Sequence, residues 1–352
     1  MSASGSRSRG ARAPRERTFW LLLVSIVVVG SAAGLLRNGA TTIPLELAPG
    51  APQPQPQVAR QRTWREVPFM PIAAIPAGEG QPLRLPTLLR AGPSGEAYVL
   101  DSGGPAVGRI SRQGELESRR TVAGAGDPTD LAVARDGSIW IADPDRGRVH
   151  VLPPAGAAPQ AIDLEVPAVR IFPRSEGFIA TPLRRSPALF LHYDGEGRLL
   201  SSFGRLFPES VQSALTIDGW MVDAGAGAFV FLFRHAGLLA AFEADGSLRF
   251  IRRTVNLVPL PAVHVDAAGR QRLDPEAPLA SIAGGIVGGS IFVLSAAGSE
   301  RSLDVYDAAE GTYRYSLRPP ETAARYVAVT GDRFYSASRR GVTVWQWTPP
   351  GS

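Results

Sequence analysis

The sequence contains no cysteine and no lysine, and each absence narrows the possible functions. Without cysteine there is no disulfide scaffold, no zinc–thiolate site and no cysteine nucleophile. All 37 basic residues are arginine, which, together with abundant alanine, glycine and proline, indicates a GC-rich genome. Only four histidines and two asparagines are present. Histidine, the side chain whose ordinary pKa lies near neutral pH, is therefore scarce.

The formal net charge of +5 is concentrated at the N-terminus. Residues 1–17 carry five arginines and one glutamate, so the other 335 residues carry a net charge of only +1. A near-neutral body has no broad positive field that would attract a phosphate backbone. The charge distribution therefore argues against nucleic acid as a partner.

An uncharged apolar run, FWLLLVSIVVVGSAAGLL, follows the basic tail at residues 19–36. Its 18 residues are about the minimum that crosses a hydrocarbon core of ~30 Å as a helix. The preceding arginines should remain in the cytoplasm, which places the rest of the chain outside it. Two alternatives remain open. Residues 18–36 form an uncleaved transmembrane signal anchor, which the length favours, or cleavage near Ala33 releases the mature chain.

Residues 37–63 are rich in proline and glutamine and include the run PGAPQPQPQ. Such a composition predicts an extended, solvated linker that holds a folded domain off the membrane. The folded domain is expected to span residues 64–349. We therefore expect a single-pass cell-membrane protein whose C-terminal domain is periplasmic or extracellular.

A repeat runs through the expected domain. Gly95 and Gly137 are 42 residues apart, and the same spacing separates Asp101 from Asp143. The clearest unit has expected strands at residues 131–134, 138–142, 148–152 and near 161–164. Short alternating apolar runs separated by turn residues are typical of an all-β repeat fold.

Six such units predict a six-bladed β-propeller preceded by one N-terminal transmembrane helix. The sixth unit, beginning near residue 331, contains only three strands of its own. We expect residues 67–76 to provide its outer strand, because Pro68 and Pro71 are tolerated at a sheet edge. Residues 253–279 lack clear alternation and are expected to be an insertion between blades four and five.

The run PTDLAVARDGSIWIAD, beginning at Pro128, is followed four residues later by RVHVL. Together these residues resemble a repeat of the NHL-type six-bladed β-propeller proteins. The resemblance implies the fold and does not specify an activity, because propellers of this kind include binding modules, lactonases and lyases.

The acidic pair Asp143 and Asp145 could belong to a calcium loop, a catalytic site or a turn. A calcium loop beginning at Asp143 would place Gly147 at position five and Pro154 at position twelve, where oxygen ligands are needed. We therefore interpret Asp143 as the end of a strand that caps a turn. No catalytic residue, metal site or cofactor is predicted.

Basic residues recur in the loops between the second and third strands of five units, all on one face of the expected ring. Acidic residues dominate the turns on the opposite face. Arginine forks suit carboxylates, phosphates and sulfated sugars. The alternative is that arginine covers every surface of a lysine-free chain. The basic loop residues are Arg146, Arg148, Arg184, Arg185, Arg234, His235, Arg301, Arg339 and Arg340.

Asp130, Arg170 and Trp220 occupy equivalent positions in adjacent units, seven residues before each unit's turn glycine. They are expected to converge at the mouth of the central channel, with Arg325 and Tyr326 nearby. A mixed polar and aromatic set of this kind can form a ligand pocket. It can equally form a salt bridge that fills the channel.

These patterns favour a membrane-tethered, extracytoplasmic recognition module that binds a protein or an anionic carbohydrate and has no catalysis of its own. The alternative is a hydrolase or lyase of the lactonase-like propeller type with its site in the channel. A structural or signalling partner of another protein is a third possibility.

Overall fold

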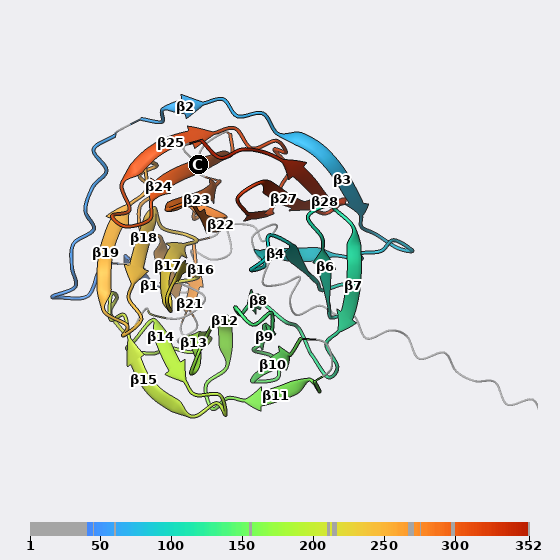
Figure 1. The fold of residues 1–352 in the computed structure, drawn as a ribbon. Coiled ribbons are helices and arrows are strands. Elements are labelled where there is room, and N and C mark those ends of the chain that lie inside the picture. The colour runs from blue at the N-terminus through green and yellow to red at the C-terminus, as the bar shows by residue number, and fades with distance from the viewer. Residues whose placement is uncertain are drawn as a thin grey trace, which may run out of the picture.

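Six antiparallel sheets surround a common axis in the computed structural model (Figure 1). The structure describes residues 41–44, 46–59, 61–154, 157–209, 212, 217–266, 271–274, 276–296 and 300–350. Six blades confirm the propeller predicted from the repeat. The predicted basic tail and transmembrane segment lie outside the described residues. Within the described ranges no helix is long and apolar enough to cross a membrane.

The first three blades follow one another along the chain, each with its strands in sequence order from the axis outward. Blade 1 consists of β4 (Pro86–Ala91), β5 (Ala97–Asp101), β6 (Ala106–Ile110) and β7 (Leu116–Thr121). Blade 2 consists of β8 (Asp130–Val133), β9 (Ile139–Asp143), β10 (Arg148–Leu152) and β11 (Gln160–Asp163). Blade 3 consists of β12 (Ala168–Arg174), β13 (Gly177–Pro182), β14 (Phe190–Tyr193) and β15 (Leu199–Phe203).

The remaining blades have the same order but recruit strands from the N-terminal part of the chain. Blade 4 consists of β16 (Gly219–Gly225), β17 (Ala228–Phe233), β18 (Leu238–Phe242) and β19 (Leu248–Arg253). Blade 5 consists of β22 (Ser281–Val287), β23 (Ser290–Ser295), β24 (Ser302–Asp307) and β25 (Tyr313–Leu317), extended by β2 (Trp64–Arg65). Blade 6 consists of β26 (Tyr326–Val329), β27 (Arg333–Ser338), β28 (Gly341–Gln346) and β3 (Met70–Pro76).

The ring is closed by β3, which pairs antiparallel with β28 from Gly341↔Pro76 to Gln346↔Met70. This is the outer position that the sequence predicts for residues 67–76. On its other side β3 lies against blade 1, where Gly114 leaves room for Ala73. The first part of the domain therefore holds the last blade against the first.

The proline-rich segment differs from the free linker that its composition predicts. Residues 46–59 and 61–65, which we call the strap, follow the outer strands of blades 4 and 5 (Figure 1). Gln55 N donates to Ile251 O at 2.9 Å, and Arg253 N donates to Gln55 O at 3.0 Å. Proline cannot donate, but Pro54 and Pro56 flank Gln55 and leave its own backbone groups free to pair with β19.

Further along the strap, side chains and β2 fix it to blade 5. Arg62 forms two hydrogen bonds with the buried Asp304, at 2.8 and 3.0 Å. β2 then pairs in parallel with β25. The folded body consequently begins well before residue 64.

The connection from blade 4 to blade 5, predicted as an insertion, carries structure of its own. β20 (Ala262–Val265) and β21 (Gln271–Leu273) form a hairpin, and β1 (Thr41–Pro44) adds to it as a third strand. These short strands were not predicted, because this part of the sequence lacks a clear alternation of apolar and polar residues.

Replacing Gly114 by alanine tests how the ring closes. Both Gly114 and Gly137 have a positive φ, +88° and +82°, so alanine is strained at either position. At Gly114 the new Cβ would also lie 2.2 Å from the Cβ of Ala73 on β3, whereas at Gly137 nothing lies within 4 Å. We expect Gly114→Ala to lower the free energy of unfolding by about 2 kcal/mol more than Gly137→Ala. Urea denaturation measures the difference; equal losses would contradict closure by β3.

Candidate functional site

The six innermost strands, β4, β8, β12, β16, β22 and β26, line the central channel, and each contacts its neighbours around the ring. Asp130 is the first residue of β8, and Asp218 directly precedes β16. Both therefore lie at the end of the channel where one blade connects to the next. We call this side the loop face, because it also carries the loops between the second and third strands of each blade.

Two groups of ion pairs occupy this entrance. Asp130 accepts a hydrogen bond from Arg90 Nη2 at 2.7 Å and another from the backbone N of Ile171 at 3.0 Å. Arg170 binds Asp218 through both Nε and Nη2, at 2.9 and 2.7 Å. Arg234 adds a further bond to Asp218, at 3.0 Å. These contacts link blades 1, 2, 3 and 4, which follow one another around the axis.

Trp220 lies between the two groups. Its ring centroid is 4.2 Å from the guanidinium carbon of Arg170 and 5.4 Å from that of Arg90. Tyr326 meets the same ring edge-on, with the centroids 6.3 Å apart. Cation–π contacts of this kind gain strength when they are shielded from water. The indole thus separates two like charges while attracting both.

Three side chains at the centre of the entrance are buried: Asp130 is 0% exposed, Arg170 6% and Trp220 4%. The side chain of Arg234, at the edge of the network, is 32% exposed. Burial tends to raise the pKa of Asp218, but the charges of Arg170 and Arg234 outweigh it and hold the pKa at about 2. Asp218 is therefore fully ionised at neutral pH. The groups that could act as acid or base here are engaged with one another.

The structure brings together Asp130, Arg170, Trp220 and Tyr326, four of the five residues expected at the channel mouth. Arg325 is exposed and acts electrostatically on Arg301 instead. Sequence analysis missed Arg90 and Asp218, which complete the network. Asp218 stands two residues before Trp220, and Arg90 stands two residues after Leu88, which lies seven residues before the turn glycine Gly95 of the first unit.

The basic loop residues divide into paired and unpaired groups. Arg148 forms an ion pair with Asp163, and Arg234 is held by Asp218. Burial and the nearby Arg234 charge lower the pKa of His235 to about 4, so this histidine is neutral at pH 7. These three residues therefore contribute little free positive charge to the loop face.

Other basic loop residues remain available to a ligand. Arg146, Arg184, Arg339 and Arg340 are exposed, and the described contacts give their side chains no acidic partner. Nη1 of Arg301 is buried without a hydrogen-bond partner, and burial, reinforced by the charge of Arg325, lowers its pKa. Arg185 is exposed but makes a further contact. Exposed guanidinium groups without an acidic partner among the described residues thus occur on the loop faces of blades 2, 3 and 6.

Asp143 ends β9 as expected, but its side chain caps the connection that precedes β8 and not the turn that follows β9. Its carboxylate accepts hydrogen bonds from the backbone N of Gly126 at 2.7 Å and of Asp127 at 3.4 Å, and lies 3.1 Å from His150 Nε2. Asp101 binds the backbone N atoms of Arg84 and Leu85 in the same way, at the same sequence offsets. The 42-residue spacing of the two aspartates therefore reflects a repeated link between the end of the second strand and the connection that precedes the first strand of the same blade. Among the described residues no cluster of three histidine or acidic side chains could hold a metal ion.

Comparisons with known proteins support the fold. No family model matches the sequence, and no curated protein matches it. Among solved structures, a streptogramin B lyase covers 80% of this chain and 97% of its own, with 12% identity and a TM-score of 0.51. Virginiamycin B lyase from Staphylococcus aureus (75% and 95% covered, 9% identity, TM-score 0.48) and BamB from Moraxella catarrhalis (79% and 99%, 12%, 0.45) also match. The likeness to the streptogramin B lyase, at 12% identity, supports the propeller fold and does not extend to an activity.

The network makes stability depend on pH through Asp218. A carboxyl whose folded-state pKa lies below its unfolded value of about 3.9 stabilises the fold above that value, and the contribution is lost as pH falls toward the folded-state pKa. We expect Asp218→Asn to cost about 3 kcal/mol at pH 7, with the deficit narrowing between pH 4 and pH 2. Chemical denaturation across this range measures it. Asp223→Asn, an exposed position on the same strand, should change stability by less than about 0.5 kcal/mol.

Because Asp143 accepts several hydrogen bonds whereas Asp145 is exposed, substitutions at the two positions should change the free energy of unfolding by different amounts. Asp143→Ala leaves two backbone N–H groups and His150 without their acceptor, so it should lower the free energy of unfolding by about 3 kcal/mol. Asp145 is exposed, and Asp145→Ala should have an effect below about 0.5 kcal/mol. Thermal and urea denaturation compare the two. Equal sensitivity of both variants to added calcium would instead indicate a shared cation site.

Proposed function

We propose that this protein is a membrane-tethered, extracytoplasmic recognition module that binds a protein or an anionic carbohydrate through its loop face. The observation that carries the proposal is the contrast between two sets of charged side chains on this face. Those at the channel entrance are mostly buried and are paired with one another, whereas Arg146, Arg184, Arg339 and Arg340 are exposed and have no acidic partner among the residues that the structure describes.

A ligand that used the charged groups at the loop-face entrance would have to break the Arg170–Asp218 or Arg90–Asp130 pair. Separating a buried pair leaves an uncompensated charge, which costs several kcal/mol. Exposed guanidinium groups carry no such cost, and their planar forks match carboxylate, sulfate and phosphate groups. The physical balance therefore favours recognition at the surrounding loops over chemistry in the channel.

We further propose that the N-terminal segment anchors the protein in the membrane and that the blades are NHL-type repeats. The apolar run at residues 19–36, preceded by five arginines, supports a signal anchor that leaves the propeller outside the cytoplasm. The run from Pro128 to Leu152 supports assignment to the NHL type. Because the strap binds blades 4 and 5, an anchored ring would stand close to the membrane rather than on a long stalk.

Removing charge from the loop face should weaken binding of polyanions. The test compares a triple variant, Arg184→Gln, Arg339→Gln and Arg340→Gln, with a control that removes the same charge from the opposite face: Arg112→Gln, Arg198→Gln and Arg314→Gln. The control arginines already pair with Asp332, Asp194 and Asp307. We expect only the loop variant to elute from immobilised heparin at lower salt, and to bind a protein captured from an extracytoplasmic extract about tenfold more weakly.

Two results would contradict the proposal. One is equal elution and equal capture for both triple variants. The other is hydrolysis of a lactone or ester by the purified protein that is lost in Asp130→Asn, because that would place chemistry in the channel.

A further inference from the structure

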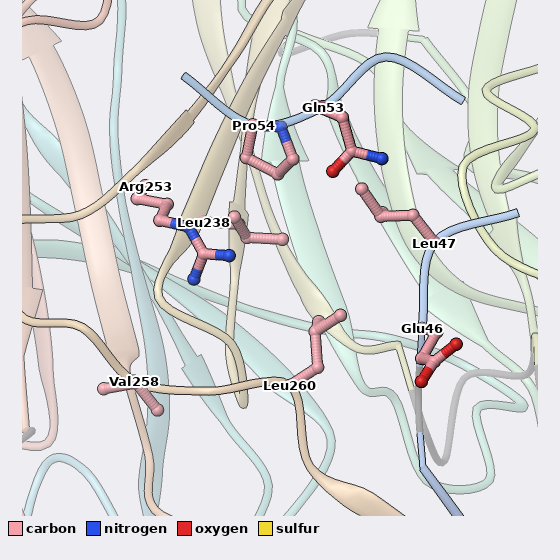
Figure 2. Close-up of a pocket in the computed structure, with 8 residues that line it drawn as sticks. All are labelled: Glu46, Leu47, Gln53, Pro54, Leu238, Arg253, Val258 and Leu260. Atoms are coloured by element: carbon pink, nitrogen blue, oxygen red, sulfur yellow. The ribbon is translucent and has the colours of Figure 1, made fainter. Parts of the chain in front are cut away.

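A cavity of about 310 Å³ lies where the strap passes over the loop-face end of blade 4. Glu46, Leu47, Gln53 and Pro54 of the strap form one wall (Figure 2). The other wall comes from the ends of β18 and β19 and from the connection that follows blade 4. It consists of Leu238, Arg253, Val258 and Leu260.

Backbone hydrogen bonds hold the strap wall in place. Ala48 N donates to Leu206 O at 2.8 Å on one side of the cavity. Gln55 pairs with Ile251 and Arg253 on the other. The strap is thus fixed at Ala48 and at Gln55, on either side of Gln53 and Pro54, while Glu46 and Leu47 directly precede the first of these points.

The opposite wall is equally well defined. Gly237 N donates to Val258 O at 3.0 Å, and Thr254 N donates to Gly237 O at 2.8 Å. A Cβ on Gly237 would lie 2.7 Å from Asn256 O and 2.8 Å from Val258 N, so the close approach of these segments requires glycine. The cavity is therefore formed before any ligand arrives, which lowers the cost of binding.

The lining is chemically asymmetric. Leu238 and Val258 are buried. Leu238 belongs to a phenylalanine-rich core cluster against which Leu47 and Leu260 also pack. These four aliphatic side chains form what we call the floor of the cavity. Arg253 and Glu46 lie on opposite sides of that floor in Figure 2. Within the described part of the chain, neither charged side chain has a hydrogen bond or an ion pair.

Gln53 adds an uncharged polar group above the floor. Its amide is turned toward the cavity in Figure 2 and has no partner among the described residues. An amide both donates and accepts a hydrogen bond, as a peptide bond does. The cavity thus offers a cation, an amide and an anion around an aliphatic surface.

We propose that this cavity binds a short aliphatic peptide with free ends. The ligand's carboxylate pairs with Arg253, its peptide bond with Gln53 and its ammonium group with Glu46, while its apolar side chains cover the leucines. A fatty acid matches the floor and Arg253 but places nothing opposite Glu46. The volume is at the small end of the range for small-molecule sites, which favours a di- or tripeptide.

The test is calorimetric titration of the full-length protein with the dipeptide Leu-Leu, its N-acetylated form and its C-terminal amide. We expect a Kd of roughly 100 µM for Leu-Leu and about tenfold weaker binding when either end is capped. Arg253→Gln should abolish the preference for a free carboxylate, and Glu46→Gln the preference for a free ammonium. Arg253→Lys should restore part of the former.

Arg198→Gln, an exposed arginine outside the cavity, serves as the matched control and should bind like the unmodified protein. Two outcomes would overturn the proposal. The first is no measurable binding of any of the three peptides by correctly folded protein. The second is binding of hexanoate as tight as that of Leu-Leu with no response to Glu46→Gln, which would make the site one for aliphatic carboxylates.

Discussion

Closure of the ring is the constraint on which the rest of this structure depends. Five blades take all four of their core strands from consecutive sequence, but blade 6 needs β3, which precedes blade 1 in the chain. Antiparallel pairing of β3 with β28 therefore fixes the two ends of the domain together. Without it, the edge of β28 would be unpaired and open to other chains.

Because the ring is closed, the innermost strands are held close enough for charged side chains from different blades to meet. The Arg170–Asp218 and Arg90–Asp130 pairs and the ring of Trp220 then fill the entrance. A buried ion pair is weak evidence for stability, since desolvation offsets much of the attraction. Its clearest effect here is geometric: the pairs engage the groups that could otherwise bind or transform a ligand on the axis.

The sequence predicted those parts of the structure that repeat. The 42-residue spacing located the first two turn glycines and the strand ends at Asp101 and Asp143. Counting back seven residues from each turn glycine then gave the inner-strand positions of Asp130, Arg170 and Trp220. It could not identify Asp218 or Arg90 as their partners, because that depends on how far long side chains reach between blades. The strap was misjudged for a related reason. Composition alone does not show that alternating proline leaves Gln55 free to pair with β19.

The propeller thus combines a channel entrance filled by ion pairs with two separate surfaces that we propose for recognition, the arginine loops and the cavity under the strap. Each depends on a different part of the fold. The loops require only the blades, whereas the cavity exists because the proline-rich segment returns to the body of the protein.

The central claim, that recognition takes place on the loop face and not in the channel, is tested most directly by amide hydrogen exchange with and without a bound sulfated polysaccharide or captured protein. The account predicts slower exchange in the loops around residues 145–147, 184–187 and 339–340, with the inner strands β8, β12 and β16 unchanged. Protection concentrated in those three inner strands would contradict it.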